Sequence, residues 1–210
     1  MSSVDRRSGL VQAALRVIAS QGVTGATTRA IVAEAGMPLA SFHYAFASRD
    51  EMMRELIALV VENEASAVFA SFEFGSDIRS SIRDGLVAFL DTIQSDPSHE
   101  QVMFELQQYA LRTPGLEHLA REQYDHYRDA VARLLVAGAE SAGIRWSVPV
   151  DDVARMVVTI TDGLTFGWLA DRDSAAAARV IEFAADSLAR LARPILTTTS
   201  PTARTKEHSA

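Results

Sequence analysis

The spacing of apolar residues constrains the fold of this chain more than any other feature. Along most of the 210 residues, apolar side chains recur every three or four positions, which places them on one side of an α-helix. Leu10, Ala14, Val17 and Ile18 show this spacing in the first segment. Alternating apolar and polar runs are rare, whereas helix-favouring alanine, leucine, arginine and glutamate are abundant. The pattern therefore predicts an all-α fold without a β-strand.

Glycine, proline and capping residues divide the chain into about nine predicted helices. Gly22 and Gly36 end the first two helices, and Pro38 suits the first turn of the third. Ser48 caps the long fourth helix, and a loop is expected over residues 143–149. The predicted helices span residues 10–21, 28–35, 39–45, 49–72, 77–94, 97–111, 116–142, 150–170 and 174–193.

The lengths of these helices indicate two domains. Three short helices come first and longer ones follow, so residues 1–52 are predicted to form a small head and residues 53–194 a larger body. The last residues, 195–210, are rich in threonine and serine and are predicted to form a disordered tail.

The charge is unevenly divided between head and body. The net charge is −7, yet the first 50 residues hold five arginines against three acidic residues. The remaining 160 residues hold 15 basic and 24 acidic side chains. A basic head on an acidic body indicates an anion-binding module; a chance fluctuation in a short window is the alternative.

Composition and charge placement also exclude several classes of protein. The chain has no cysteine, which excludes disulfides, thiol nucleophiles and zinc–thiolate sites. Gln12 and Arg16 interrupt the apolar core that a signal peptide needs. Arg155 and Asp162 likewise interrupt the most apolar later stretch. A cytoplasmic protein without a membrane segment is therefore predicted.

Neither catalysis nor metal binding is indicated. The sequence has no nucleophile elbow, phosphate-binding glycine loop or convincing carboxylate pair, so no enzyme activity and no cofactor are expected. His118, Glu122 and His126 share one helix face at a spacing that would allow a metal pair. Without an HExxH motif, a solvated face is the preferred interpretation, and no metal site is predicted.

Residues 27–46 have the pattern of a helix-turn-helix motif. Ile31 and Val32 face the core, Gly36 supplies the tight turn, and Phe42 and Phe46 hold the second helix in place. Such a unit presents its second helix to the major groove of DNA. An αα-hairpin inside an ordinary helical bundle is the alternative.

A longer pattern runs from about residue 7 to residue 53. It consists of Ala13, Ala14, Leu15, Ile18, Ala19, Gly22, Thr27, Arg29, Ile31, Ala35, Gly36 and the stretch SFHYAFASRDE at residues 41–51. With this pattern the sequence resembles the TetR family of bacterial transcriptional regulators. The later segments Asp162-Gly163-Leu164 and Trp168-Leu169 resemble the BetI-like C-terminal class of that family.

The resemblance implies a homodimer that binds double-stranded DNA at a palindromic operator and holds a small-molecule effector. Leu39 and His43 depart from the family pattern, which usually has a lysine or arginine and a tyrosine there. An arm formed by Arg6 and Arg7 is therefore expected to share in DNA binding. The positions that correspond to the family's DNA contacts are Thr27, Thr28, Arg29, Pro38, Leu39, Ser41, His43, Tyr44 and Arg49, and these residues are predicted to bind DNA.

Two further sets of residues are predicted in the body. Apolar bulk with a few polar tips is typical of small-molecule pockets, although each such residue could instead be plain core. The predicted effector pocket consists of Phe89, Ile93, Met103, Phe104, Gln107, Tyr124, Tyr127, Met156 and Phe166. The predicted dimer interface consists of Gly163, Phe166, Gly167, Val180, Ile181, Ala184, Leu188 and Leu191; internal packing of this face is the alternative.

The sequence does not decide the environment of three polar residues in the same apolar helix. Thr159, Thr161 and Asp162 could line a cavity or face solvent. Taken together, the sequence predicts a ligand-responsive, dimeric DNA-binding repressor in which the fourth helix carries the movement between body and head. The competing interpretation is a helical small-molecule-binding or scaffold protein whose helix-turn-helix no longer binds DNA.

Overall fold

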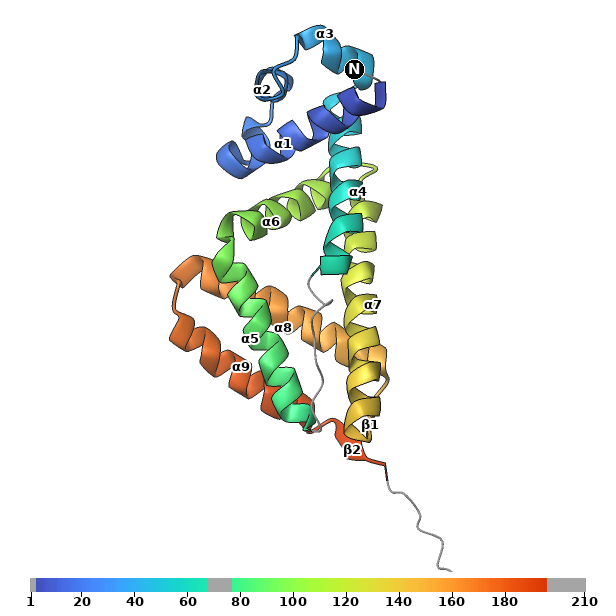
Figure 1. Ribbon diagram of the computed structural model, residues 1–210, viewed down its shortest axis with the longest axis vertical. Helices are drawn as coiled ribbons and strands as arrows, with labels where there is room; N and C mark the ends of the chain where they lie inside the picture. Colours follow the sequence, from blue (N-terminus) through green and yellow to red (C-terminus); the bar gives the residue numbers. More distant parts are fainter. Residues whose placement is uncertain (1–2, 68–76, 196–210) are drawn as a thin grey trace, which may run out of the picture.

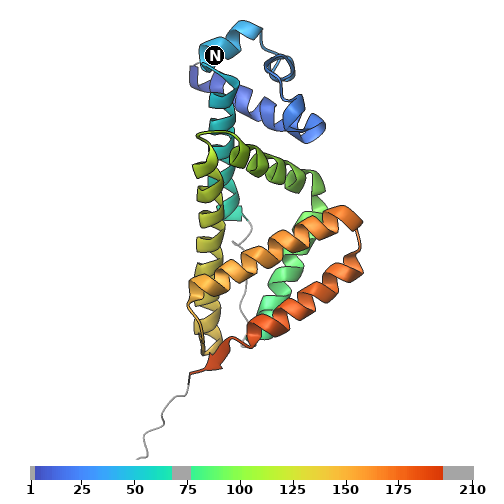
Figure 2. The same ribbon diagram turned by 180° about the vertical axis from the view of Figure 1, so that it is seen from behind.

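The computed structural model describes residues 3–67 and 77–195. Within them the predicted all-α fold is confirmed, because nine helices form an elongated molecule with a small head at one end and a larger body at the other (Figures 1 and 2). The helices are α1 (Ser3–Gly25), α2 (Thr28–Glu34), α3 (Leu39–Ala45), α4 (Arg49–Ala67), α5 (Ile78–Ser95), α6 (Pro97–Arg112), α7 (Glu117–Ala142), α8 (Val150–Asp171) and α9 (Ser174–Ala189).

Helices α1 to α3 form the head, and their local signals work as the sequence predicts. The Thr27 hydroxyl accepts a hydrogen bond from the Ala30 N–H at 3.2 Å and caps α2. Gly22 has φ 72° and ψ 171°, so helical geometry is interrupted where the first helix was expected to end. Phe42 and Phe46 of α3 are almost fully buried, with ring centroids 5.6 Å apart. The helix-turn-helix is therefore packed as a rigid unit.

The core of the head continues into the body without a break. One buried cluster contains Ile18 of α1, Met52 and Met53 of α4, Leu106 of α6 and Leu119 of α7. From the head, α4 runs alongside α7 (Figures 1 and 2). The predicted boundary at residues 52 and 53 thus lies inside α4, where two fully buried methionines pack against both parts.

The rest of the body has two further cores, and α8 contributes to both. Leu86 and Leu90 of α5 pack with Trp168 of α8 and Ile181 of α9. Leu135 of α7, together with Val153 and Val158 of α8, forms the other cluster. Helix α5 runs from the end of α6 alongside α9 and covers the inner side of α9 (Figure 1).

The prediction that the chain has no strand is wrong at one place. Strands β1 (Ile144–Trp146) and β2 (Ala192–Pro194) pair antiparallel, with Arg145 opposite Arg193. They replace part of the predicted loop at 143–149 and the last turn of the predicted final helix, which ends at Ala189. The Trp146 indole N–H donates to the Leu135 carbonyl at 3.1 Å and fixes β1 to α7. Three-residue strands are too short to show a period of two in the sequence.

Two predicted segments extend past the described residues. The fourth helix was expected to reach residue 72, and α4 is described to Ala67. The predicted disordered tail, 195–210, lies outside the described residues apart from Ile195, whose N–H donates to the Gly143 carbonyl at 3.0 Å. Among the described helices, none combines the length and the apolar character that crossing a membrane requires.

Candidate DNA-binding head and its link to the body

The outer face of α3 is the most exposed part of the helix-turn-helix. Tyr44 is 81% exposed and Leu39 is 43% exposed, whereas Phe42 on the opposite side is 1% exposed. His43 is exposed as well and lines a shallow hollow with Ala40 and Tyr44. Figure 1 shows α3 at the far end of the molecule, away from the body. A surface of this shape can enter a groove of DNA without obstruction from the rest of the chain.

The other predicted head residues lie at the starts of α2 and α3. Thr27 is the N-cap of α2, and Thr28 and Arg29 are its first two residues. Arg29 is exposed and makes no hydrogen bond or ion pair within the described ranges, so its guanidinium is available to an anion. Pro38 is the N-cap of α3, one position before the first turn where it was expected, and Ser41 is half-buried in α3.

Arg49, by contrast, is half-buried and hydrogen-bonded within the protein. Its Nε donates to the Ala26 carbonyl at 2.8 Å and its Nη2 to the Val23 carbonyl at 2.7 Å. Its Nη1 donates to the Tyr109 hydroxyl at 3.2 Å, and the guanidinium lies 5.3 Å from the centre of that ring. Each nitrogen of Arg49 therefore already has an internal acceptor. The structure gives this arginine a role in joining the head to α6 that the sequence did not predict.

Arg7 does not lie in the free DNA-binding arm that the sequence predicted. Rather than belonging to a free arm, it lies in α1, and its Nε donates to Glu55 of α4 at 3.0 Å. It also hydrogen-bonds Glu51 and the Ala45 carbonyl and stacks 4.3 Å from the centre of the Phe46 ring. The hydrogen bond to Glu55 is the main cause that raises the pKa of Arg7. An arm of this kind was expected because sequence alone does not show that α1 begins as early as Ser3.

A group of hydrogen-bonded residues, which we call the head–body contact, joins α6 to the head: Arg49, Asp50, Glu105, Tyr109 and the backbone of Val23. The Glu105 carboxylate of α6 accepts a hydrogen bond from the Val23 N–H at 2.6 Å. The Tyr109 hydroxyl, also on α6, donates to Asp50 at the start of α4 at 2.6 Å. Burial raises the pKa of Tyr109, which keeps the hydroxyl protonated as a donor. A displacement of α6 must break or move these bonds.

No signal in the sequence identified Glu105 and Tyr109. They stand four positions apart and so share a face of α6, but that spacing is common to many surface helices. In the structure, Glu105 approaches the chain at Gly22, whose φ of +72° is a conformation that glycine adopts readily. A Cβ added at Gly22 would lie 3.1 Å from the Glu105 Oε2.

The nine residues predicted to line an effector pocket do not meet at one place. Met103 packs in the core shared with the head, and Ile93 in the core of α5, α8 and α9. Phe89 packs against that second core, Tyr124 and Tyr127 against the third, and Gln107 is half-buried on α6. Phe104 and Phe166 do meet, with ring centroids 6.1 Å apart in an edge-to-face arrangement.

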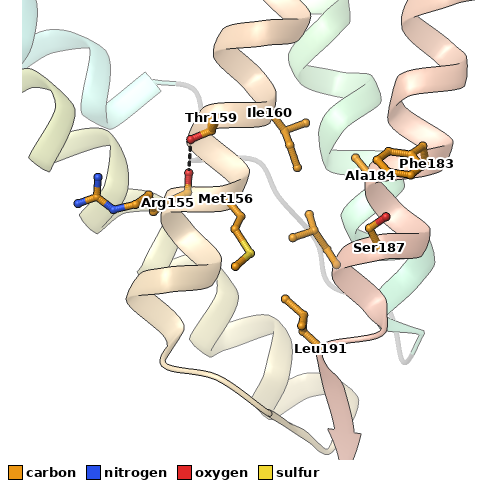
Figure 3. Close-up of a pocket in the computed structure, with 9 residues that line it drawn as sticks. Arg155, Met156, Thr159, Ile160, Phe183, Ala184, Ser187 and Leu191 are labelled. Carbon is orange, nitrogen blue, oxygen red and sulfur yellow. Dashed lines mark hydrogen bonds between the residues drawn. The ribbon is translucent and has the colours of Figure 1, made fainter.

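An apolar groove lies between α8 and α9 (Figure 3). It has a volume of about 530 Å³, and Met156 is the one predicted pocket residue that borders it. The sequence assigned this region to the dimer interface, and Ala184, Leu188 and Leu191 border it too. The full lining is Arg155, Met156, Thr159, Ile160, Phe183, Ala184, Ser187, Leu188 and Leu191.

The predicted dimer residues divide into two groups. Ile181, Ala184 and Leu188 are at most 2% exposed, because they pack in the chain's own cores against α5 and α7. The alternative of internal packing therefore holds for these three. Large apolar side chains on the outer side of α8 and α9 remain uncovered: Phe166 at 67%, Val180 at 46% and Phe183 at 72%. Phe183 was missed, although its spacing of three from Val180 places it on the same side of α9.

Comparison with known proteins decides the family. Residues 10–56 match the family described as bacterial regulatory proteins, tetR family. Residues 79–193, more than half of the chain, match the C-terminal domain of BetI-type transcriptional repressors. The chain belongs to the tetR family. Both resemblances drawn from the sequence are thereby confirmed, and this tetR-family protein is a DNA-binding transcriptional regulator.

Relatives and solved structures agree with this assignment. The nicotine-responsive transcriptional repressor HdnoR of Paenarthrobacter nicotinovorans is 31% identical over 171 residues, which cover 81% of this chain and 87% of HdnoR. A crystal structure of the multidrug binding protein EbrR complexed with ethidium is 27% identical, with a TM-score of 0.66 over 89% of this chain and 98% of EbrR. A tetR-type regulator from Haloarcula marismortui ATCC 43049 shares the fold, with a TM-score of 0.72 at 18% identity over 90% of this chain and all of that one.

Proposed function

We propose that this tetR-family regulator is a cytoplasmic homodimer that represses transcription from a palindromic operator and is released by a small organic effector. The observation that carries the proposal is the exposed outer face of α3, where Tyr44 is 81% exposed on a helix-turn-helix of the matched family. HdnoR, a nicotine-responsive repressor, and EbrR, a multidrug binding protein, support the effector-dependent part.

In the head, α3 enters the major groove and the residues at the helix starts meet phosphates. Tyr44 and His43 lie on the outer face, and Leu39 and Ser41 flank it. Arg29 supplies a cation that is free for a phosphate, and Thr27, Thr28 and Pro38 lie at the adjacent helix N-termini. Leu39 contributes an apolar contact in place of a donor. Arg49 supports the same surface from behind, because it fixes the segment that leads into α2.

Dimerisation covers the uncovered apolar side of α8 and α9. Phe166, Val180 and Phe183 are large apolar side chains that are exposed on this side of the body, and Met156 is 43% exposed beside them. Gly163 and Gly167 lie on the same side of α8, where a Cβ would meet nothing within 4 Å, so a second copy can approach the backbone closely. Two copies of this helix pair form a four-helix bundle.

The effector acts by shifting the population of head spacings. Phe104 and Glu105 are consecutive residues of α6, and the first contacts α8 while the second holds the head. An effector that moves α6 therefore changes the head–body contact directly. Helix α4, predicted to carry the movement, begins at that contact through Asp50. The two heads then lose the spacing that the two half-sites of the operator require.

The test is fluorescence anisotropy of a labelled duplex from the DNA that flanks the gene, with a scrambled duplex as the reference. Wild type and Tyr44→Ala are titrated at two salt concentrations. We expect tight binding to the flanking duplex that weakens steeply with salt, because phosphate contacts release counterions. Tyr44→Ala should weaken it by about tenfold or more, in line with the loss of a good base contact. Equal, weak binding of both duplexes by wild type, unaffected by Tyr44→Ala, would contradict the proposal and favour a head that no longer binds DNA.

A further inference from the structure

Helix α3, which carries the outer face of the helix-turn-helix, is only seven residues long. Its N-cap is Pro38, whose side chain has no group that could accept a hydrogen bond from the first turn. The helix packs chiefly against α1 and α2, where Phe42 and Phe46 are buried. A short link, residues 46–48, joins it to α4. The position of α3 relative to α4 therefore depends on the contacts that hold this link.

Arg7 of α1 connects the end of α3 to the start of α4. Its Nη1 donates to the carbonyl of Ala45, the last residue of α3, and its guanidinium lies 4.3 Å from the centre of the Phe46 ring. On the side of α4, its Nε donates to Glu55 at 3.0 Å and its Nη2 to Glu51 at 3.3 Å. Figures 1 and 2 show the start of α1 beside the start of α4, close to the end of α3. We call Arg7, Glu51 and Glu55 the Arg7 cluster.

The Arg7 cluster also fixes the link itself. The Glu51 carboxylate accepts a hydrogen bond from the Ala47 N–H at 2.7 Å, and the Ser48 hydroxyl accepts one from the Glu51 N–H at 3.1 Å. This reciprocal pairing caps the start of α4. At the other end of the link, the positive guanidinium lies at the carbonyl end of α3, where the helix dipole favours a cation. The planar group with its five donors can hold both helices at once, which a lysine cannot do.

The Arg7 cluster adjoins the head–body contact in the first turn of α4. Asp50 accepts a hydrogen bond from the Tyr109 hydroxyl of α6 at 2.6 Å, and the next residue, Glu51, contacts Arg7 at 3.3 Å. Consecutive carboxylates of α4 therefore hold α6 on one side and the end of α3, through Arg7, on the other. A displacement of α4 that begins at α6 reaches α3 through these bonds.

We propose that Arg7 is a positioning residue for DNA recognition: held by Glu51 and Glu55, it fixes α3 relative to α4 and so sets the preference of the head for its operator without contacting DNA. This inference rests on the proposed function and deepens it. Each nitrogen of Arg7 already donates within the chain. Base contacts select a sequence only when α3 lies at the correct angle in the groove, whereas phosphate contacts bind any sequence. Loss of the Arg7 cluster should therefore reduce selectivity more than binding to unrelated DNA.

The experiment measures anisotropy of the flanking and the scrambled duplex with the full chain at several salt concentrations. The temperature is one at which circular dichroism shows every variant folded. We expect Arg7→Ala to lower the preference for the flanking duplex by about tenfold, because the fraction of chains with α3 in the binding orientation falls. The salt dependence of binding should match that of wild type, since no phosphate contact is lost. If Arg7→Ala does not fold, Glu55→Ala provides the test, because it leaves Arg7 in place.

Glu55→Ala separates positioning from charge. By charge alone, the loss of a carboxylate from the head strengthens binding to both duplexes. Because Glu55 also holds Arg7, we expect weaker binding to the flanking duplex instead. The double variant should lose no more preference than Arg7→Ala, since both changes disrupt one group of contacts. Glu34→Ala is the matched control: it removes the same charge from the head, where Glu34 accepts from Arg16 at 2.6 Å between α2 and α1, and should leave the preference unchanged.

Three results would overturn the inference. Arg7→Ala weakens both duplexes by the same factor with a smaller salt dependence, which would make Arg7 a phosphate contact; Glu55→Ala binds the flanking duplex as tightly as wild type or more tightly; or Glu34→Ala loses as much preference as Arg7→Ala.

Amide hydrogen exchange without DNA distinguishes failure of this inference from failure of the proposed function. We expect the amides of α3 to exchange faster in Arg7→Ala than in wild type, and at the wild-type rate in Glu34→Ala. Unchanged exchange in Arg7→Ala overturns the inference, even when wild type selects the flanking duplex. A wild type that binds both duplexes equally contradicts the proposed function, and with it the role of Arg7 in selectivity, although faster exchange in Arg7→Ala still shows that Arg7 holds α3.

Discussion

The two ends of the molecule expose very different surfaces. The head buries the aromatic residues Phe42 and Phe46, and its outer face presents Tyr44, His43 and the smaller apolar residue Leu39. The body leaves Phe166 and Phe183 more than half exposed along α8 and α9. The outer face of the head suits DNA, and we propose that a second copy of the chain covers the exposed aromatic residues of the body.

Phe183→Glu should have the largest effect, because it disrupts the proposed dimer face of the body. A charge at a side chain that is 72% exposed is harmless to one chain but is buried without a partner in a dimer. We expect size-exclusion chromatography with light scattering to give a mass near 22.8 kDa in place of twice that value. Operator affinity should fall by about a hundredfold or more, since one head holds only one half-site.

Val136→Glu is the matched control for Phe183→Glu. Val136 on α7 is a 44% exposed apolar residue outside the α8–α9 face, so the same charge there should leave the dimer intact. A variant Phe183→Glu that stays dimeric, or a Val136→Glu that also dissociates, would show that the uncovered face is not the interface.

Arg29→Ala tests the head side at a single phosphate. We expect a moderate loss of operator affinity that is similar for all sequences, and a salt dependence of binding that is smaller by about one unit of log–log slope. Arg121→Ala removes the same charge from an exposed position on α7 and should change neither quantity. The measurement is anisotropy at four or more salt concentrations; an unchanged slope in Arg29→Ala would place Arg29 away from the DNA.

Glu105→Ala tests the link between the two ends. It leaves the Val23 N–H without its acceptor, which should lower the free energy of unfolding by about 1–2 kcal/mol in urea titrations. Because α6 then holds the head less firmly, the ratio of operator affinities with and without bound effector should shrink toward one. Glu122→Ala on α7, an exposed carboxylate without a contact in the described part of the chain, serves as the control. An effector response equal to that of wild type would exclude the head–body contact as the route.

Asp162→Asn should have the smallest effect, a slight rise in melting temperature at neutral pH. Burial raises the pKa of Asp162 above its ordinary 3.8, so the folded chain holds this proton more tightly than the unfolded chain and ionisation favours unfolding. The gain from asparagine should be present at pH 7.5 and shrink as the pH falls toward 3.8. Asp151→Asn should lower the melting temperature slightly instead, because Asp151 lies in the first turn of α8 and interacts with the helix dipole. A fall with Asp162→Asn would mean that the carboxylate has a stabilising partner.

The sequence predicted the head more fully than the body because head signals are local. Thr27 caps α2 through a donor three residues away, and the core residues of α1 repeat at helical spacing. On α9 the same periodicity marked Ile181 and Leu188 as apolar but did not show which helix covers them. Both pack against other helices of the same chain, whereas Phe183, which lies on another side of α9, is exposed. Spacing gives the orientation of side chains around one helix and not the position of its neighbours.

By itself the sequence determined the order of the helices, the helix-turn-helix and the family, because periodicity, caps and motifs act within a few residues of one another. Only the tertiary structure decided what the arginines and the apolar faces do. Val23 and Glu105 are 82 positions apart, and Arg49 and Tyr109 are 60 apart. The residues next to each of them in the sequence therefore do not indicate these contacts. Arg49 matched a phosphate contact of the family and yet donates within the chain, because the end of α1, the linker that follows it and α6 bring three acceptors within its reach.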